Sequence, residues 1–516
     1  MDGLRRGFKD AWDRREDQTR RQWPVWVLAL TFYGLVGLLL LTKVHIPSPL
    51  HLVVFFMAAA VLSVTSMRIE WGLLALALIL PFARPGITVG NPRVFHISGF
   101  NFALVGVTVA YVLRYVADAQ FAKLGPMVRR TRLDRNILAF TFLVLLSCLW
   151  SFNLNTAPRI AMKTGLFLKE QVLYLVWFYM LVTLLRNPKD LRRFAMSFAI
   201  AGLMASLFGM ATRLTGGADA ITAGTMGQNL GEGAGGRMEG GWLGLGHPNM
   251  FAALLLMTMP IWFFAVSHLK HGIRRLLAEV AVINGFLGIL FTYSRSAWVG
   301  SILGIGLVGL ADRKSLQRIF LFVIIFAIVA QTVVLFTIDM NLVEVVINRV
   351  RQLETTTFSA RPYIYASTIQ VIKAYPLTGV GLGAFPAHAP ATPFGWVPSH
   401  SHNVYLAYAA EAGIPAAFLF SILMVRILAM SVRNLKVVGR VPGYGFIALG
   451  SCGALLGLIA QTMAVQVFHH RILGFSFYAL AAIVVALDRM IREGQFDELG
   501  SVEPGVRSRV SPWIES

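Results

Sequence analysis

Two arginines and a histidine lie at junctions between apolar and polar stretches. Arg295 lies between two apolar runs, Arg361 begins a predicted amphipathic helix, and His402 directly precedes a predicted helix over 403–412. Guanidinium groups bind phosphate oxygens through a planar fork of N–H donors. A neutral imidazole can accept a proton from a hydroxyl group. The three side chains therefore suit a reaction in which a diphosphate leaves and a hydroxyl attacks.

Structural explanations are open for the same residues. Arg295 can be a snorkelling arginine at the membrane boundary, Arg361 a solvated charge, and His402 a helix cap. His400 and His402 could also be metal ligands, but no carboxylate cluster lies near them in the sequence. We therefore expect no metal and no other cofactor.

Two further pairs are candidates for substrate contacts. His247 and Asn249 flank a proline where a glycine-rich segment meets an apolar run, and they can equally close the end of a helix. Gly379 and Gly381 follow the helix that Arg361 begins. They lack the strand–turn–helix setting of a nucleotide-binding loop, and a tight turn that brings the backbone close to other groups explains them as well.

The composition excludes a soluble globular domain. Of 516 residues, 56% are hydrophobic and only 14% charged, against about 25% charged in soluble domains. Apolar runs long enough to cross a bilayer recur along the chain. The net charge of +21 would favour nucleic acid in a soluble protein, but the basic residues lie between apolar runs, so they report membrane topology instead. We expect an all-α polytopic membrane protein that binds no nucleic acid.

We expect about fourteen transmembrane helices (12–14), one for each apolar run. The runs are 24–42, 49–67, 71–82, 97–116, 137–152, 166–185, 194–211, 249–266, 276–293, 297–311, 319–338, 414–432, 444–468 and 472–487.

Most of the 46 Lys and Arg residues fall in connections that lie on the inner side if the N-terminus is inside. Both termini are then cytoplasmic, and the candidate residues face the periplasm or the exterior. The predicted organisation is a basic N-terminal segment (1–23), a transmembrane bundle with a glycine-rich outer loop at 212–248 (24–338), a large outer loop with amphipathic helices (339–402), C-terminal transmembrane helices (403–488) and a cytoplasmic tail (489–516).

Three motifs in one order resemble the O-antigen ligase and O-antigen polymerase superfamily. The first is the serine–arginine motif at 294–298, and the second is an arginine-led helix that runs into a Pro-Leu-x-Gly-x-Gly turn at 361–381. The third is His402-Asn403 followed, after nine residues, by Gly413 and then Ala416. Ala416 departs from the family's usual residue, which weakens an assignment to ligases alone. The resemblance covers roughly 246–428.

The resemblance implies a metal-independent glycosyltransferase in a bacterial inner membrane. Its donor would be a glycan on undecaprenyl diphosphate and its acceptor a sugar hydroxyl, on lipid A core for a ligase or on another repeat unit for a polymerase. Arg295 and Arg361 would hold the diphosphate, His402 would activate the hydroxyl, and Asn403 would orient His402 or a sugar. A flippase for a lipid-linked sugar is the alternative of another class; the absence of a half-to-half repeat argues against it.

Overall fold

The computed structural model describes residues 44–45, most of 57–82, 86–89, 96–117, 125–154, 158–214, 247–269, 272–292, 294–311 and 357–496, with the single residues 317 and 324. The chain divides into two compact units, Met1–Arg129 and Arg130–Ser516.

Eight described helices are long and apolar enough to cross a membrane. The expectation of a polytopic α-helical membrane protein is therefore confirmed, whereas the number of about fourteen spans stays a prediction. The predicted runs 24–42 and 319–338 lie outside the described residues except for Ile324, and the run 49–67 is described only in part. The first amphipathic piece of the predicted outer loop and residues 215–246 of the glycine-rich loop also lie outside them, whereas residues 212–214 belong to a helix.

Unit 1 contains one candidate span, α4 (Gly99–Ala117), and a shorter apolar helix, α3 (Ile69–Ile79), which continues into the 3-10 turn η1 (Leu80–Phe82). It also contains a small antiparallel sheet of β1 (Val44–His45), β2 (Gly86–Val89) and β3 (His96–Ser98). The expectation of an all-α chain missed this sheet. Short β-branched stretches between apolar helices pair their backbone groups with each other where no helix does so.

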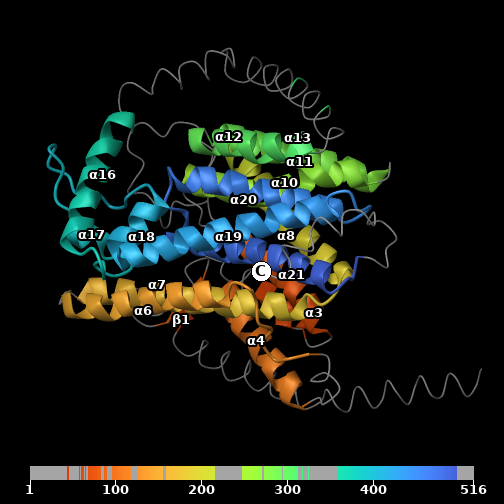
Figure 1. Ribbon diagram of the computed structural model, residues 1–516, viewed down its shortest axis with the longest axis horizontal. Helices are drawn as coiled ribbons and strands as arrows, with labels where there is room; N and C mark the ends of the chain where they lie inside the picture. Colours follow the sequence, from red (N-terminus) through yellow and green to blue (C-terminus); the bar gives the residue numbers. More distant parts are fainter. Residues whose placement is uncertain are drawn as a thin grey trace, which may run out of the picture. The chain divides into compact units, whose positions relative to one another are not determined.

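Unit 2 is a bundle of long helices that run side by side (Figure 1). Its elements are α6 (Asp134–Leu154), α7 (Pro158–Leu184), α8 (Pro188–Leu214), α10 (Pro248–His268), α11 (Ile273–Phe291), α12 (Arg295–Ser301), the π-helical η3 (Ile302–Gly306), α13 (Leu307–Ala311), α16 (Thr357–Ala374), α17 (Phe385–His388), α18 (Val404–Ala412), α19 (Ile414–Val438), α20 (Gly445–Thr462), η4 (Val467–His469) and α21 (Arg471–Arg492).

The predicted apolar runs of unit 2 that are described all form helices. Seven of these helices are candidate spans: α6, α7, α8, α10, α19, α20 and α21. The run 276–293 forms α11, which is not among the candidate spans and begins with Arg274, Arg275 and Glu279 in its first two turns. The run 444–468 was predicted too long, because α20 ends at Thr462 and a turn leads into η4.

The core of unit 2 is formed by α10, α20 and α21, whose side chains are almost all buried. Close packing of α12 and η3 on α20 depends on glycine. A methyl group on Gly304 would overlap the carbonyl oxygen of Gly453, and one on Gly300 would crowd the carbonyl of Gly457. Small residues of this kind let two helix backbones approach closely, which is how helices gain packing contacts in a membrane.

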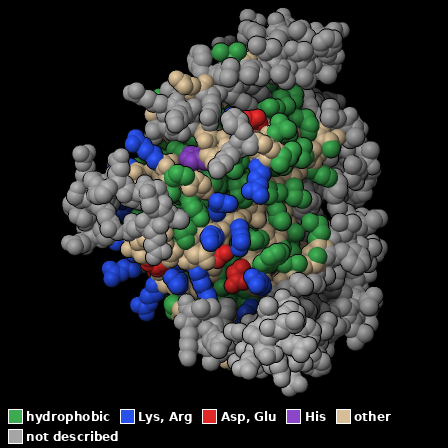
Figure 2. Space-filling model, turned by 90° about the vertical axis from the view of Figure 1, so that its right-hand side faces the viewer, with side chains coloured by type: hydrophobic (Ala, Val, Ile, Leu, Met, Phe, Trp, Pro, Cys, Tyr) green, Lys and Arg blue, Asp and Glu red, His purple; other side chains and the backbone are tan. Residues whose placement is uncertain are grey.

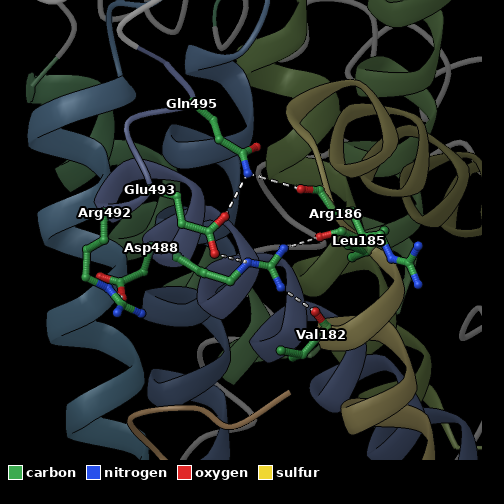
Figure 3. Close-up of polar contacts among 8 residues, drawn as sticks. Val182, Leu185, Arg186, Asp488, Arg492, Glu493 and Gln495 are labelled. Atoms are coloured by element: carbon green, nitrogen blue, oxygen red, sulfur yellow. Dashed lines mark hydrogen bonds and ion pairs between the residues drawn. The ribbon is translucent and has the colours of Figure 1, made fainter. Parts of the chain in front are cut away.

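Polar side chains join the helices at the end of α21. Arg489 donates hydrogen bonds to the carbonyl oxygens of Val182, at 2.6 Å, and of Leu185 (Figure 3). These carbonyls lie at the end of α7, where a helix leaves its last carbonyls without backbone partners and carries partial negative charge. Arg489 therefore fixes the end of α21 to the end of α7.

Candidate active site

His402 has a left-handed backbone conformation directly before α18. Its φ of 55° is the one positive value at a non-glycine residue in the described part of the chain. This conformation costs a non-glycine residue on the order of 1–3 kcal/mol, so the surrounding contacts must hold it in place.

A glutamine from the segment between α20 and η4 holds the residue before His402. The side-chain oxygen of Gln466 accepts a hydrogen bond from the backbone N–H of Ser401 at 3.2 Å and lies 3.4 Å from the Ser401 hydroxyl. That hydroxyl donates to the carbonyl oxygen of Asn403 at 2.8 Å. Ser401 and Gln466 are both buried. The backbone is therefore fixed on both sides of His402.

Asn403, and not His402, caps α18. Its side-chain oxygen accepts from the backbone N–H groups of Tyr405, at 2.9 Å, and Leu406, at 3.1 Å. Its side-chain nitrogen donates to the carbonyl oxygen of Met463 at 3.0 Å. The amide thus ties the start of α18 to the end of α20, and its predicted contact with a sugar stays a prediction.

Basic side chains surround the imidazole of His402. The ring centroids of His400 and His402 are 4.1 Å apart. The pKa of His402 is lowered to about 3, mainly by burial and then by the positive charges of His400, Arg361 and His247. His402 is therefore neutral at pH 7, as a general base must be. Burial and the neighbouring cations are causes of the lowered pKa that the sequence did not reveal.

Arg361 lies one turn inside α16 and not at its start. The predicted second amphipathic helix is present, but it begins at Thr357, and Pro362 lies inside it. The unpaired N–H groups of a helix start therefore do not lie at Arg361, and this corrects the sequence argument. The guanidinium group of Arg361 itself lies close enough to His402 to lower the pKa of that imidazole.

A small apolar core holds α16 over the segment that leads to His402. The hydroxyl of Ser367 on α16 donates to the carbonyl oxygen of Pro390 at 3.1 Å. Figure 1 shows α16, α17 and α18 gathered at one end of the bundle. The core consists of Val371, Val380, Ala384, Phe385, Ala389 and Ala410. Packing of these elements on one another explains why residues 361 and 402 meet.

His247 and Asn249 lie at the start of α10. His247 is the N-cap, and its Nδ1 accepts the backbone N–H of Asn249 at 3.2 Å. The carbonyl oxygen of Asn249 accepts from the side chain of Gln461, near the end of α20, at 2.9 Å. Both residues thus help to close a helix, and the charge of His247 also acts on His402.

The helices α12 and α20 pack antiparallel to each other. This packing places Arg295 at the end of unit 2 where His402 and His247 lie. The register between α12 and α20, extended to the start of α12, places Arg295 level with Thr462. Thr462 follows Gln461, whose side chain binds Asn249. One terminal nitrogen of the Arg295 guanidinium is fully buried. The facing pairs that set the register are Gly300 with Gly457 and Gly304 with Gly453.

Gly379 and Gly381 lie at the opposite end of α18 from His402. Both have positive φ, and the backbone N–H of Gly381 donates to the carbonyl oxygen of Glu411 at 2.8 Å. Because α18 runs from Val404 to Ala412, its ends are about 12 Å apart. The structure does not bring these glycines to the histidines; it gives them the tight turn that was the other reading of the sequence.

Ser401, Gln461 and Gln466 did not emerge from the sequence as site residues. Gln461 and Gln466 fell within a predicted transmembrane run, where their polarity alone was the signal that could have marked them. Their partners lie more than sixty positions away in the chain, so no local spacing pattern identifies them.

Within the part of the chain that the structure describes, no three His, Cys, Asp or Glu side chains are grouped so that they could hold a metal ion. Metal independence nevertheless stays a prediction.

Comparison with known proteins identifies one region of the chain. No curated protein matches the chain significantly. Residues 280–421, roughly a quarter of the 516, match the family model of the O-antigen ligases. The matched region contains Arg295, Arg361 and His402, whereas His247 lies outside it. The resemblance stated from the sequence is thereby confirmed: residues 280–421 of this multi-pass membrane protein match the O-antigen ligase family, which supports the O-antigen ligase and polymerase superfamily.

Proposed function

We propose that this protein is a membrane glycosyltransferase of the O-antigen ligase type. It transfers a glycan from undecaprenyl diphosphate to the hydroxyl of an acceptor sugar, without a metal ion, on the outer face of a bacterial inner membrane. The observation that carries the proposal is the meeting of His402 with Arg361 inside the region that matches the O-antigen ligase family. Arg295 lies at the same end of unit 2.

The basic side chains suit the departure of a diphosphate. In the proposed reaction the acceptor oxygen bonds to the anomeric carbon of the glycan, and the bond from that carbon to the diphosphate oxygen breaks. Arg295 and Arg361 neutralise the charge that develops on the leaving group. The products are the elongated acceptor and undecaprenyl diphosphate.

The proton of the acceptor hydroxyl passes to His402. A base with a pKa of about 3 is weak at neutral pH, because the ideal value for a base lies near the working pH. A bound diphosphate would place negative charge beside His400, Arg361 and His402. That charge opposes the effect of the cations and raises the pKa of His402. Donor binding thus prepares the base for its task.

A defined transfer assay tests the proposal and separates its alternatives. The full-length protein is reconstituted into liposomes with an undecaprenyl-diphosphate glycan, with and without lipid A core. A ligase forms product only when lipid A core is present. A polymerase, which would use the same donor chemistry, forms ladders from donor alone.

The alternative of another class is a flippase, which would move the donor across the bilayer without forming any glycosidic bond. Transport with no transfer product in either arm would therefore contradict the proposed function. The same assay in the presence of a chelator tests metal independence. Loss of transfer that a divalent ion restores would contradict that part of the proposal.

A further inference from the structure

A second group of basic side chains lies at the other end of unit 2. Four arginines lie near one another there, two of them paired with the carboxylate of Asp488, and we name the four the arginine cluster. Nε of Arg492 lies 3.1 Å from Oδ2 of Asp488, and Nη2 of Arg433 lies 3.8 Å from Oδ1. The arginine cluster consists of Arg132, Arg426, Arg433 and Arg492.

Contacts across three helices hold the arginine cluster together. Arg426 on α19 donates to the side chain of Asn136 on α6 and, at 3.1 Å, to the carbonyl oxygen of Arg132. Burial lowers the pKa of Arg132, and the charges of Arg492, Arg433 and Arg426 lower it further, while Asp488 opposes them. The guanidinium groups of Arg426, Arg433 and Arg492 are thus close enough to Arg132 to repel its charge.

The arginine cluster carries more positive charge than its surroundings balance. Among the described residues, Asp488 pairs with Arg433 and Arg492, whereas the nearby Asp134 is bound by the hydroxyls of Thr131 and Tyr179. Glu493, the next acid along α21, lies 3.7 Å from Arg489 instead. Nε of Arg433 is buried and has no hydrogen-bond acceptor among the described residues. Figure 2 looks onto this end and shows Lys and Arg side chains gathered there with few acids, and Figure 3 shows Asp488 beside Arg492. The local charge favours an anion.

Exposed apolar side chains begin next to the arginine cluster and continue along the bundle. On α19, Phe418 and Val425 are 64% and 65% exposed, and Val425 adjoins Arg426. α6 and α19 pack against each other. On α6 the exposed side chains recur every three or four residues and so share one face, which starts two residues after Asn136. They are Leu138, Phe142, Leu145 and Leu149.

We propose that the arginine cluster binds the phosphate headgroup of an anionic membrane lipid, whose acyl chains lie along the exposed apolar face of α6 and α19. A free phosphate would satisfy the arginines but would leave the adjoining apolar face unused. Arg433 lies nineteen residues after Ile414, so the cluster is about 28 Å along α19 from the end where His402 lies. In the orientation predicted from the sequence, this end faces the cytoplasm, where anionic lipids attract basic side chains.

Native mass spectrometry of the full-length protein tests this site. The protein is released from nanodiscs made of equal amounts of phosphatidylglycerol and phosphatidylcholine, and the lipid that stays bound is identified. The wild type retains phosphatidylglycerol in preference to phosphatidylcholine. The amount of phosphatidylglycerol bound to the double variant R426Q/R433Q is lower by roughly tenfold or more, because two of the phosphate-binding charges are gone.

Two matched variants control for charge and for folding. R192Q/R193Q removes two arginines from the start of α8, at the same end of unit 2 but outside the cluster. There Arg192 lies over the ring of Tyr444 and Arg193 pairs with Asp190. This variant retains phosphatidylglycerol as the wild type does. R426K/R433K preserves both charges and also retains the lipid.

Each of three results would overturn the proposal. One is undiminished phosphatidylglycerol on R426Q/R433Q, and another is an equal loss on R192Q/R193Q, which would assign the effect to overall charge. The third comes from an arm with added inorganic phosphate: displacement of the bound lipid by phosphate would assign a free-anion site rather than a lipid site. Transfer activity is not used as a readout, so the result is independent of the proposed function.

Discussion

The side-chain oxygen of Gln466 lies 3.2 Å from the backbone nitrogen of Ser401 and accepts its hydrogen bond. A residue beyond the end of α20 thus fixes the backbone directly before His402. The clamp helps to hold His402 in its left-handed conformation, with a φ of 55°, which costs energy even though histidine adopts it more often than most residues do. The clamp sets the direction in which the imidazole points.

The clamp predicts that Q466A impairs turnover more than donor binding. Loss of the acceptor lets the backbone at Ser401 relax and displaces the imidazole, and displacements of about 1 Å can cost on the order of a hundredfold in rate. We expect kcat to fall by about ten- to a hundredfold while KM for the donor changes little. Q466E keeps an oxygen acceptor and recovers part of the rate.

The control is Q495A, at the other end of unit 2, where the side chain of Gln495 donates to the carbonyl of Arg186. Equal kcat values for Q466A and Q495A would contradict the clamp.

Replacement of Arg361 by lysine tests the guanidinium fork. R361K preserves the positive charge but loses the planar pair of N–H donors that matches phosphate oxygens. We expect donor affinity to fall by at least about tenfold, measured as binding of undecaprenyl diphosphate to protein in nanodiscs, because charged hydrogen bonds are worth about 1.5–3 kcal/mol each. R193K, on the far end of the bundle, should bind as the wild type does. Unchanged affinity in R361K would mean that Arg361 acts as a simple charge.

The lowered pKa of His402 predicts an unusual reactivity at acid pH. Diethyl pyrocarbonate modifies only neutral imidazole. A histidine with the ordinary pKa of about 6.5 loses roughly 25-fold in its neutral fraction between pH 7 and pH 5. His402, with a pKa of about 3, stays neutral at both values, so its rate of modification is nearly unchanged.

Peptide mapping by mass spectrometry measures this rate residue by residue, and the detergent-unfolded protein is the control that shows the ordinary drop. A drop at His402 in the folded protein as large as in the unfolded protein would contradict the lowered pKa of this imidazole. R361Q removes one of these cations and raises the pKa of His402, so modification at low pH slows.

Two glycines of the same helical segment give opposite predictions for stability. A methyl group at Gly304 overlaps the carbonyl of Gly453, whereas one at Gly306 meets no atom within 4 Å. Overpacking costs about 1–3 kcal/mol, so G304A lowers the melting temperature in detergent and also moves the start of α12 with Arg295. G306A keeps or raises it, because alanine favours helix over glycine by roughly 1 kcal/mol. Equal melting temperatures for the two variants would argue against close packing of η3 on α20.

The sequence allowed prediction of those features that depend on residues close together in the chain. Apolar runs located the helices, and the start of α18 was predicted correctly, but its cap is Asn403 and not His402. It placed Arg361 at a helix start because Pro362 suits a first turn, yet α16 begins at Thr357. It grouped Gly379 and Gly381 with the site because they follow Arg361 in the chain, whereas packing on α18 separates them from His402. Gln466 was missed because its partner lies 65 positions away. The predicted sides of the membrane and domain limits remain predictions.

The central claim is that His402 accepts the proton of the acceptor hydroxyl while the arginines hold the donor. Single-turnover transfer by H402Q, at saturating donor, tests it most directly, with H388Q as a control that changes a histidine of α17. We predict that H402Q binds undecaprenyl-diphosphate glycan as the wild type does but transfers it on the order of 10²–10⁴ times more slowly, whereas H388Q keeps the wild-type rate. Transfer by H402Q at close to the wild-type rate would contradict this claim.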